Sequence, residues 1–152
     1  MRIKFSIKIL LFFQALICLA SFNNLGFAQE FNFRKYSIKD GLPQSQVNSI
    51  YQEHSGYVWL GTTGGVVRLD GKKSNLFSIN EGLLSNSVKT LVQFNKSIYV
   101  GTNKGVSKIL DNRVSSISSD NLAVNDLLVW DDQVIVASER GLQLVRNDSL
   151  VE

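Results

Sequence analysis

The sequence predicts an all-β protein built from four-stranded antiparallel sheets of the kind found in β-propeller blades. The first observation is an internal repeat: residues 36–42 recur almost unchanged at residues 77–83, a shift of 77 − 36 = 41 positions. The second is a series of short apolar segments separated by Gly, Asn and Asp, which is typical of strands joined by tight turns. The third is the absence of an amphipathic helical pattern beyond residue 28. A period of about 40 residues built from short strands indicates propeller blades.

The first full repeat defines a strand pattern that the other two follow. Its strands are expected at residues 47–52, 57–62, 66–69 and 75–78. Those of the second repeat are expected at residues 88–94, 97–102, 106–109 and 113–117, and those of the third at residues 124–130, 133–138, 142–145 and 149–151. We therefore expect blade 1 at residues 47–79, blade 2 at residues 80–117 and blade 3 at residues 118–152.

A set of glycine, leucine, threonine and aromatic residues recurs at equivalent positions and is expected to maintain the blades. The set is Gly41, Leu42, Trp59, Gly61, Thr62, Gly65, Gly82, Leu83, Tyr99, Gly101, Thr102, Gly105 and Gly141. Trp59 and Tyr99 hold the same place in the first two repeats, so we expect both to pack between neighbouring blades. The third repeat has Ala137-Ser138 where the others have Gly-Thr.

Residues 29–46 are expected to form an outer strand and a loop ahead of the first full repeat. Residues 31–38 alternate apolar and polar side chains for most of their length, as a half-buried strand does. Residues 33–38 align with residues 74–79, so the segment resembles a fourth strand without the three that precede it. The sequence also contains about three repeats, whereas closed propellers have ~4–8 blades. The predicted ring is therefore incomplete, and the sequence is expected to be an N-terminal fragment that lacks downstream blades.

The first 28 residues are expected to be a secretory signal peptide. Arg2, Lys4 and Lys8 precede an apolar run over residues 9–20, and the Gly26–Ala28 segment supplies small residues for cleavage. The apolar run is too short for a transmembrane helix. We therefore expect an exported chain, on the periplasmic or extracellular face of the inner membrane.

Removal of the leader changes the charge balance of the chain. The full sequence has 16 Lys and Arg against 13 Asp and Glu, and the leader holds three of the basic residues. The remainder therefore carries 16 − 3 = 13 basic and 13 acidic residues, with no net charge. This balance argues against nucleic-acid binding, which requires clustered basic residues. Cys18, the single cysteine, also leaves with the leader, so neither a disulfide nor a thiolate metal site is expected.

The repeats contain no residue pattern that points to catalysis or to a cofactor. His54 is the single histidine and lies in a predicted turn without a second histidine or cysteine, so we expect a solvated residue. Six aspartates fall at predicted turns, where their side chains stabilise the bend: Asp40, Asp70, Asp111, Asp120, Asp131 and Asp132. Gly61, Gly64 and Gly65 lie between two strands with no following helix, which argues against a phosphate-binding loop. We therefore expect no catalytic residue, no metal and no cofactor.

Recognition of a ligand is the chemistry that remains. In a propeller, the connections that lead into the first strand of a blade share one end with the turns between its second and third strands. The residues expected at this end are neutral and polar: Gln44, Ser45, Gln46, Thr62, Thr63, Asn86 and Asn103, with Ser87 and Lys104 beside them. Such side chains suit a hydroxyl-rich ligand such as an oligosaccharide, although loops are also polar simply because they face water.

The motifs of the repeat resemble those of the two-component regulator propeller family. They are Gly41-Leu42-Pro43, Val47-Asn48-Ser49-Ile50 and the segment from Gly56 to Asp70 with its Trp-Leu-Gly-Thr core. The resemblance covers residues 31–145 and is weakest in the third repeat. It implies the periplasmic sensor region of a membrane histidine kinase, in which a ligand changes the packing of paired ectodomains. The family's immunoglobulin-like, membrane-spanning and kinase domains have no counterpart among these residues.

These observations predict an extracytoplasmic, ligand-sensing propeller segment of a two-component signalling protein, which binds and does not catalyse. The partners expected are an oligosaccharide or other small ligand, the missing downstream blades and output domain, and a second copy in a homodimer. One alternative is part of a carbohydrate-active enzyme or lyase built on a propeller. A second alternative is a short secreted repeat protein that assembles through its open blade faces.

Overall fold

The computed structural model describes residues 11–12, 14, 33–71, 73–117 and 121–151. The chain divides into two compact units, Met1–Arg34 and Lys35–Glu152, and all three sheets belong to the second. The signal peptide expected at residues 1–28 lies outside the described residues except for residues 11, 12 and 14, which are helical. Among the residues described, no helix is long and apolar enough to cross a membrane.

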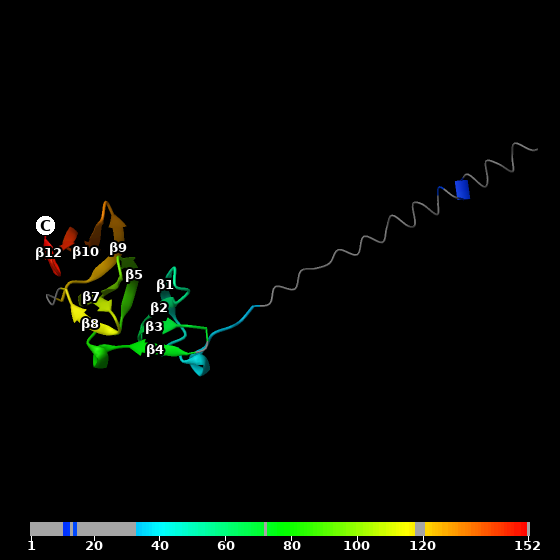
Figure 1. Cartoon of the computed structure of the whole chain (residues 1–152), viewed down its shortest axis with the longest axis horizontal. Helices are drawn as coiled ribbons and strands as arrows, with labels where there is room; N and C mark the ends of the chain where they lie inside the picture. Colours follow the sequence, from blue (N-terminus) through cyan, green and yellow to red (C-terminus); the bar gives the residue numbers. More distant parts are fainter. Residues whose placement is uncertain (1–10, 13, 15–32, 72, 118–120, 152) are drawn as a thin grey trace, which may run out of the picture. The chain divides into compact units, whose positions relative to one another are not determined.

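Three four-stranded antiparallel sheets form the blades, which confirms the predicted all-β fold (Figure 1). Blade 1 comprises β1 (Val47–Gln52), β2 (Val58–Thr62), β3 (Gly65–Leu69) and β4 (Ser74–Phe77). Blade 2 comprises β5 (Val88–Phe94), β6 (Ser97–Thr102), β7 (Gly105–Leu110) and β8 (Arg113–Ser116). Blade 3 comprises β9 (Val124–Trp130), β10 (Gln133–Ser138), β11 (Gly141–Arg146) and β12 (Ser149–Val151). In each blade the strands follow one another in chain order across the sheet.

The strand expected at residues 31–38 is not present in the part of it that the structure describes. Residues 33–37 have no regular structure, and Ile38–Asp40 form a short 3-10 helix, η1. Alternating side chains are not sufficient for a strand, because its backbone N–H and C=O groups need a neighbour to bond to. The strand positions of blade 1 are already taken by β1–β4, and no other described strand pairs with this segment.

The recurrent Ser-Ile-x-Asp/Glu-Gly-Leu motif is a capped 3-10 helix at the entrance to each of the first two blades. In η2 (Ile79–Glu81), the Glu81 carboxylate accepts from the Ser78 backbone N–H at 2.8 Å and from the Ser78 hydroxyl at 2.7 Å. In η1, the Asp40 carboxylate likewise accepts from the Ser37 backbone N–H at 2.8 Å and from the Ser37 hydroxyl at 2.9 Å. Gly82 ends η2 at φ 109, a conformation that favours glycine. The motif therefore recurs because it redirects the chain between blades and buries Leu42 and Leu83.

The capping carboxylate makes the blade entrance sensitive to acid. The two hydrogen bonds from Ser78, side chain first, lower the pKa of Glu81 below its ordinary value. A lowered folded-state pKa gives stability that is complete above the unfolded-state pKa and is lost as the pH falls through the folded-state pKa. We expect Glu81→Gln to flatten the acid limb of a plot of urea midpoint against pH. The exposed control Glu139→Gln should leave that limb unchanged, and equal slopes for wild type and Glu81→Gln would contradict the assignment.

Blades 1 and 2 meet in an apolar seam, which we call seam 1–2. Successive side chains of a strand point to opposite faces, so each blade has two faces to cover. One face of blade 1 supplies Trp59, Val66 and Phe77, with Tyr51 beside them. Blade 2 meets it with Val88, Leu91, Ile98, Val100 and Ile109, with Val114 beside them. Trp59 is central: its ring stacks on Phe77 with centroids 5.6 Å apart, and its indole N–H donates to Glu53.

Seam 2–3 repeats the same plan one blade further along. The face of blade 2 that carries Tyr99, Val106 and Ile117 packs against blade 3. Blade 3 supplies Val124, Leu127, Val134 and Val136. Tyr99 thus lies in seam 2–3 where Trp59 lies in seam 1–2, and burial raises the pKa of its phenol.

The first strand of each following blade packs closely against the preceding blade, and this close packing explains the glycine of each Gly-Thr pair. The Asn48 side chain donates to the Val88 carbonyl at 2.8 Å, which ties β1 to β5. A Cβ on Gly61 would lie 2.7 Å from Val88 Cγ1, and one on Gly101 would lie 2.7 Å from Val124 Cγ1. Real Cβ atoms do not come so close, so glycine is required wherever the first strand of the next blade packs.

Candidate functional site

The threonine of each Gly-Thr pair stabilises the turn between the second and third strands. The Thr62 hydroxyl donates to the Gly65 carbonyl at 2.8 Å and accepts from the Gly64 N–H at 3.0 Å. Thr102 does the same in blade 2, and Ser138 does so in blade 3. The expectation that Thr62 contacts a ligand is therefore corrected, because its side chain is fully buried and its hydroxyl is engaged in the turn.

The other predicted loop residues lie at the same end of blades 1 and 2. Gln44, Ser45, Gln46, Thr63 and Asn103 are exposed, and Asn86 is half-buried. The Gln46 amide donates to Asn48 Oδ1 at 3.1 Å, and Asn86 Oδ1 accepts from the Ile79 N–H at 2.8 Å. We call the five exposed residues and Asn86 the loop-end group.

Two contacts bring the entrance connection and the second turn of one blade together. In blade 2, the Asn103 N–H donates to the Ser87 carbonyl at 3.3 Å. In blade 1, a Cβ on Gly64 would lie 3.0 Å from Gln44 Cγ, so Gln44 is against that turn. The amides of the loop-end group therefore sit on a framework fixed by the buried Thr62 and Thr102.

Sequence reasoning missed two hollows at the opposite end of the strands. The first, of about 140 Å³, lies across seam 1–2 and is lined by Tyr57, Arg68, Lys96 and Asn112 among others. The Arg68 guanidinium lies 4.8 Å from the Tyr57 ring centre and 5.6 Å from that of Trp59. Arg68 also donates to Asn112 Oδ1 at 2.8 Å, which links β3 to the turn between β7 and β8.

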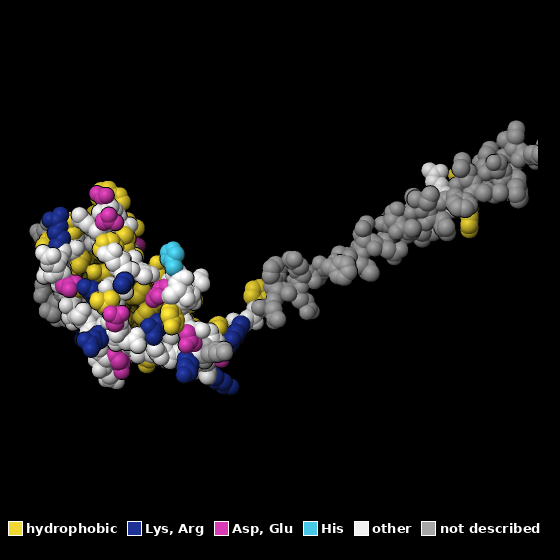
Figure 2. Space-filling model, in the orientation of Figure 1, with side chains coloured by type: hydrophobic (Ala, Val, Ile, Leu, Met, Phe, Trp, Pro, Cys, Tyr) yellow, Lys and Arg dark blue, Asp and Glu magenta, His cyan; other side chains and the backbone are white. Residues whose placement is uncertain are grey.

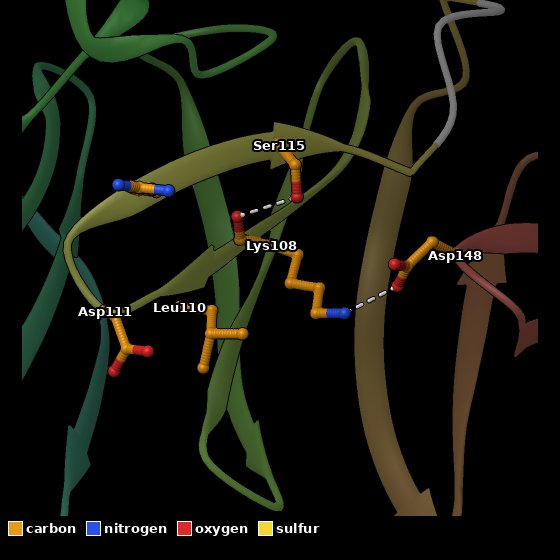
Figure 3. Close-up of a pocket in the computed structure, with 6 residues that line it drawn as sticks. Lys108, Leu110, Asp111, Ser115 and Asp148 are labelled. Atoms are coloured by element: carbon orange, nitrogen blue, oxygen red, sulfur yellow. Dashed lines mark hydrogen bonds and ion pairs between the residues drawn. The ribbon is translucent and has the colours of Figure 1, made fainter.

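The second hollow, of about 530 Å³, lies across seam 2–3 (Figure 3). Lys108, on β7, extends to Asp148 in the turn between β11 and β12, at 2.7 Å. Leu110, Asp111, Arg113 and Ser115 complete the lining. Arg68 and Lys108 are equivalent residues, and so are Asn112 and Asp148. Alignment of the three repeats would have revealed this recurrent link between a basic side chain and the next blade.

The Lys108–Asp148 pair is expected to contribute little to stability. The hydrogen bond from Lys108 to Asp148 is the main reason that the pKa of Lys108 is raised. Asp148 is 59% exposed, so water and salt screen the pair. Exposed pairs of this kind contribute about 0.2–1 kcal/mol. A double-mutant cycle with Lys108→Ala and Asp148→Ala, measured by urea unfolding, should give a coupling energy in that range that shrinks at high salt. A coupling that is insensitive to salt would contradict the screened geometry.

The described residues offer no metal centre, since no group of three or more His, Cys, Asp or Glu side chains among them could hold an ion. His54 is exposed in the turn between β1 and β2 (Figure 2, cyan). Asp111 and Asp148 both lie in turns and have positive φ values of 48 and 58. The chemistry that the site presents is hydrogen bonding by neutral amides and hydroxyls at the loop end, and by the cations Arg68 and Lys108 at the seams.

Comparison with known proteins supports the predicted family. The model of the family described as "Two component regulator propeller" matches residues 41–64, the segment from the end of η1 to the turn after β2. This match confirms the resemblance predicted from the sequence motifs. No curated protein matches the chain.

The solved structures that are similar to this chain include extracellular domains of two-component systems from B. thetaiotaomicron. The extracellular domain of the hybrid two component system BT3049 superimposes with a TM-score of 0.64 at 19% identity, over 81% of this chain and 19% of that one. That of the hybrid system BT4673 gives a TM-score of 0.63 at 16% identity, over 72% of this chain and 16% of that one. This chain thus spans about a fifth or less of the length of these structures. The likeness establishes the propeller fold.

Proposed function

We propose that this chain is a segment of an extracytoplasmic, ligand-sensing propeller that belongs to a two-component signalling protein. The family match at residues 41–64 carries the proposal, and the extracellular domains that share the fold support it. Within the proposal, the segment binds a ligand and does not transform it. Export through the leader at residues 1–28 would place it on the periplasmic or extracellular face of the inner membrane.

The loop-end group is the proposed ligand contact. Gln44, Gln46 and Asn103 present amides, which donate and accept hydrogen bonds without a net charge. Such a surface suits an oligosaccharide, whose hydroxyls also donate and accept. The loops rest on rigid, buried supports, so a bound ligand would act on the blades that hold them rather than on free loops.

The test uses the protein purified after export from a bacterial host. A panel of neutral oligosaccharides is screened by thermal unfolding, and each mixture is analysed by chromatography for products. We expect at least one member to raise the Tm without being cleaved, and the double variant Gln44→Ala/Asn103→Ala to lose the rise. The control Ser116→Ala changes an exposed residue on the outer strand of blade 2 and should keep it.

Two other results would contradict the proposal. Cleavage of an oligosaccharide would favour the alternative of a propeller enzyme. A Tm rise that survives in the double variant would remove the loop-end group from the binding surface, and the hollows at seams 1–2 and 2–3 would become the next region to mutate.

A further inference from the structure

A bulge re-aims one polar side chain in the first strand of every blade. The pairing of β1 with β2 shifts register between Val47 and Ser49, and the same shift recurs in β5 and in β9. The residue at the shift has no partner on the second strand, and it is Asn48, Lys89 or Asn125. Such an extra residue turns its side chain out of the regular alternation. All three side chains are exposed, and none of them belongs to the apolar clusters of the seams.

Hydrogen bonds hold these bulges beside one another, because β1 lies against β5 and β5 against β9. The Asn48 amide donates to the carbonyl of Val88, the residue before Lys89, at 2.8 Å. The hydroxyl of Thr90, the residue after Lys89, donates to Asp126 at 2.9 Å and so ties β5 to β9 beside the third bulge. Each bulge residue is the second of its strand, close to the connection that enters the blade. The three residues therefore form a row next to the loop-end group.

The charge of the loop end differs from blade to blade. Residues 41–49 and 61–65 of blade 1 hold no charged side chain. The equivalent residues of blade 2, 82–90 and 101–105, hold Lys89 and Lys104 and no acidic residue, which gives a net charge of 2 − 0 = +2. Blade 3 combines the cation Arg140 with the acidic Asp126 and Glu139. Among the described blades, net positive charge at the loop end therefore belongs to blade 2.

The two lysines of blade 2 lie on segments that are bonded to each other. Val88 pairs with Thr102 between β5 and β6, and the Asn103 N–H donates to the Ser87 carbonyl at 3.3 Å. Both lysine side chains are exposed. Neither forms an ion pair with a described residue, unlike Lys108 at seam 2–3. Their charges are therefore available to a ligand that meets the loop-end group.

We propose that Lys89 and Lys104 form an anion-binding subsite of the loop-end group, and that the ligand is an acidic oligosaccharide. Its anionic group, a carboxylate or a sulfate ester, lies between the two ammonium groups, and its hydroxyls meet the amides of Gln44, Gln46 and Asn103. Lysine suits this role because its ammonium is a compact charge on a flexible stem. The inference rests on the proposed function, since it names the ligand class of the same surface.

The two charges should favour an acidic ligand over its neutral partner by a modest factor. One exposed ion pair changes an affinity by about 1.4- to 5-fold, so two such pairs change it by roughly 2- to 25-fold. Salt screens exposed charges, and the Debye length falls to about 3 Å at ~1 M ionic strength. The preference for the acidic form should therefore shrink at high salt, while the hydrogen bonds to neutral hydroxyls remain.

The experiment compares acidic oligosaccharides with neutral partners of the same chain. Oligogalacturonides and oligomannuronates are tested against their methyl esters, and carrageenan oligosaccharides against their desulfated forms. Isothermal titration measures their binding to the exported, purified protein at low salt and at about 1 M salt. The variants are Lys89→Gln and Lys104→Gln, singly and together. Lys73→Gln is the matched control, because Lys73 is exposed in the turn between β3 and β4, at the opposite end of blade 1.

We expect an acidic member to bind about 2- to 25-fold more tightly than its neutral partner at low salt. The double lysine variant should lose this difference and keep the binding of the neutral partner, whereas Lys73→Gln should keep both. A preference confined to the uronate series assigns a carboxylate, and one confined to the carrageenan series assigns a sulfate.

Three results would overturn the subsite. They are equal affinity for the acidic and neutral forms, a preference that survives in the double lysine variant, and a lack of binding by every acidic member. The proposed function stands in each case if neutral oligosaccharides bind and Gln44→Ala/Asn103→Ala abolishes that binding. If neither acidic nor neutral oligosaccharides bind, the proposed function fails together with the subsite.

Discussion

Trp59→Ala is expected to remove a large part of the stability of this protein. The side chain is 3% exposed and lies at the centre of seam 1–2, so its loss leaves a cavity between two blades. It also leaves the Glu53 carboxylate without the indole donor and removes one of the two rings on which Arg68 rests. Truncation of a buried aromatic residue costs about 3–5 kcal/mol. The whole free energy of unfolding of a domain is about 5–15 kcal/mol, so this loss is a large fraction of it.

Urea unfolding followed by circular dichroism measures this effect, and Trp59→Phe is the conservative comparison. Phenylalanine keeps an aromatic ring against Phe77 and loses the indole N–H, so its cost should be clearly smaller. A loss below about 0.5 kcal/mol for Trp59→Ala would match an ordinary surface substitution. That result would show that seam 1–2 does not depend on this ring.

The positions of the strands could be predicted from the sequence because turns and strands both left local signals. Asn and Asp tolerate positive φ better than other residues. The hairpin turns at Asp111-Asn112, Asp131-Asp132 and Asn147-Asp148 all adopt it. Between such turns, apolar side chains alternate, which indicates one strand after another. These signals depend on a few neighbouring residues, so no knowledge of distant contacts was needed.

The features that the sequence analysis got wrong or missed have different causes, some local and some distant. Residues 33–37 have the alternation of a strand and lack a neighbouring strand in the described structure. Thr62 is polar and lies beside a turn, which favours a surface role, yet its hydroxyl forms hydrogen bonds within the turn itself.

The Ser78–Glu81 capping box was a local signal that the sequence contained, since Ser and Glu at this spacing indicate a capped helix start. The seam hollows join residues 40 or more positions apart, such as Lys108 and Asp148, and only an alignment of the repeats points to them.

Gly65→Ala is expected to have the second large effect, because the substitution has two separate costs at one residue. Gly65 has φ 123, a conformation that side chains rarely adopt, and its Cβ would lie 2.4 Å from the carbonyl oxygen of Phe77. The left-handed conformation costs roughly 1–2 kcal/mol for a residue with a side chain. The clash adds about 1–3 kcal/mol, because it is with backbone of β4 and cannot be relieved by a change of rotamer.

Gly141 provides the matched control, since it occupies the same turn position in blade 3. Its φ is 102, and a Cβ there would meet no atom within 4 Å. Gly141→Ala therefore carries the conformational cost without the clash, about 1–2 kcal/mol. Urea unfolding of both variants should show the larger loss of unfolding free energy for Gly65→Ala. The difference between the two losses measures the cost of the close approach of β3 to β4. Equal losses would mean that β4 moves away freely. In that case the glycine of the turn would be required for its backbone conformation alone, in every blade.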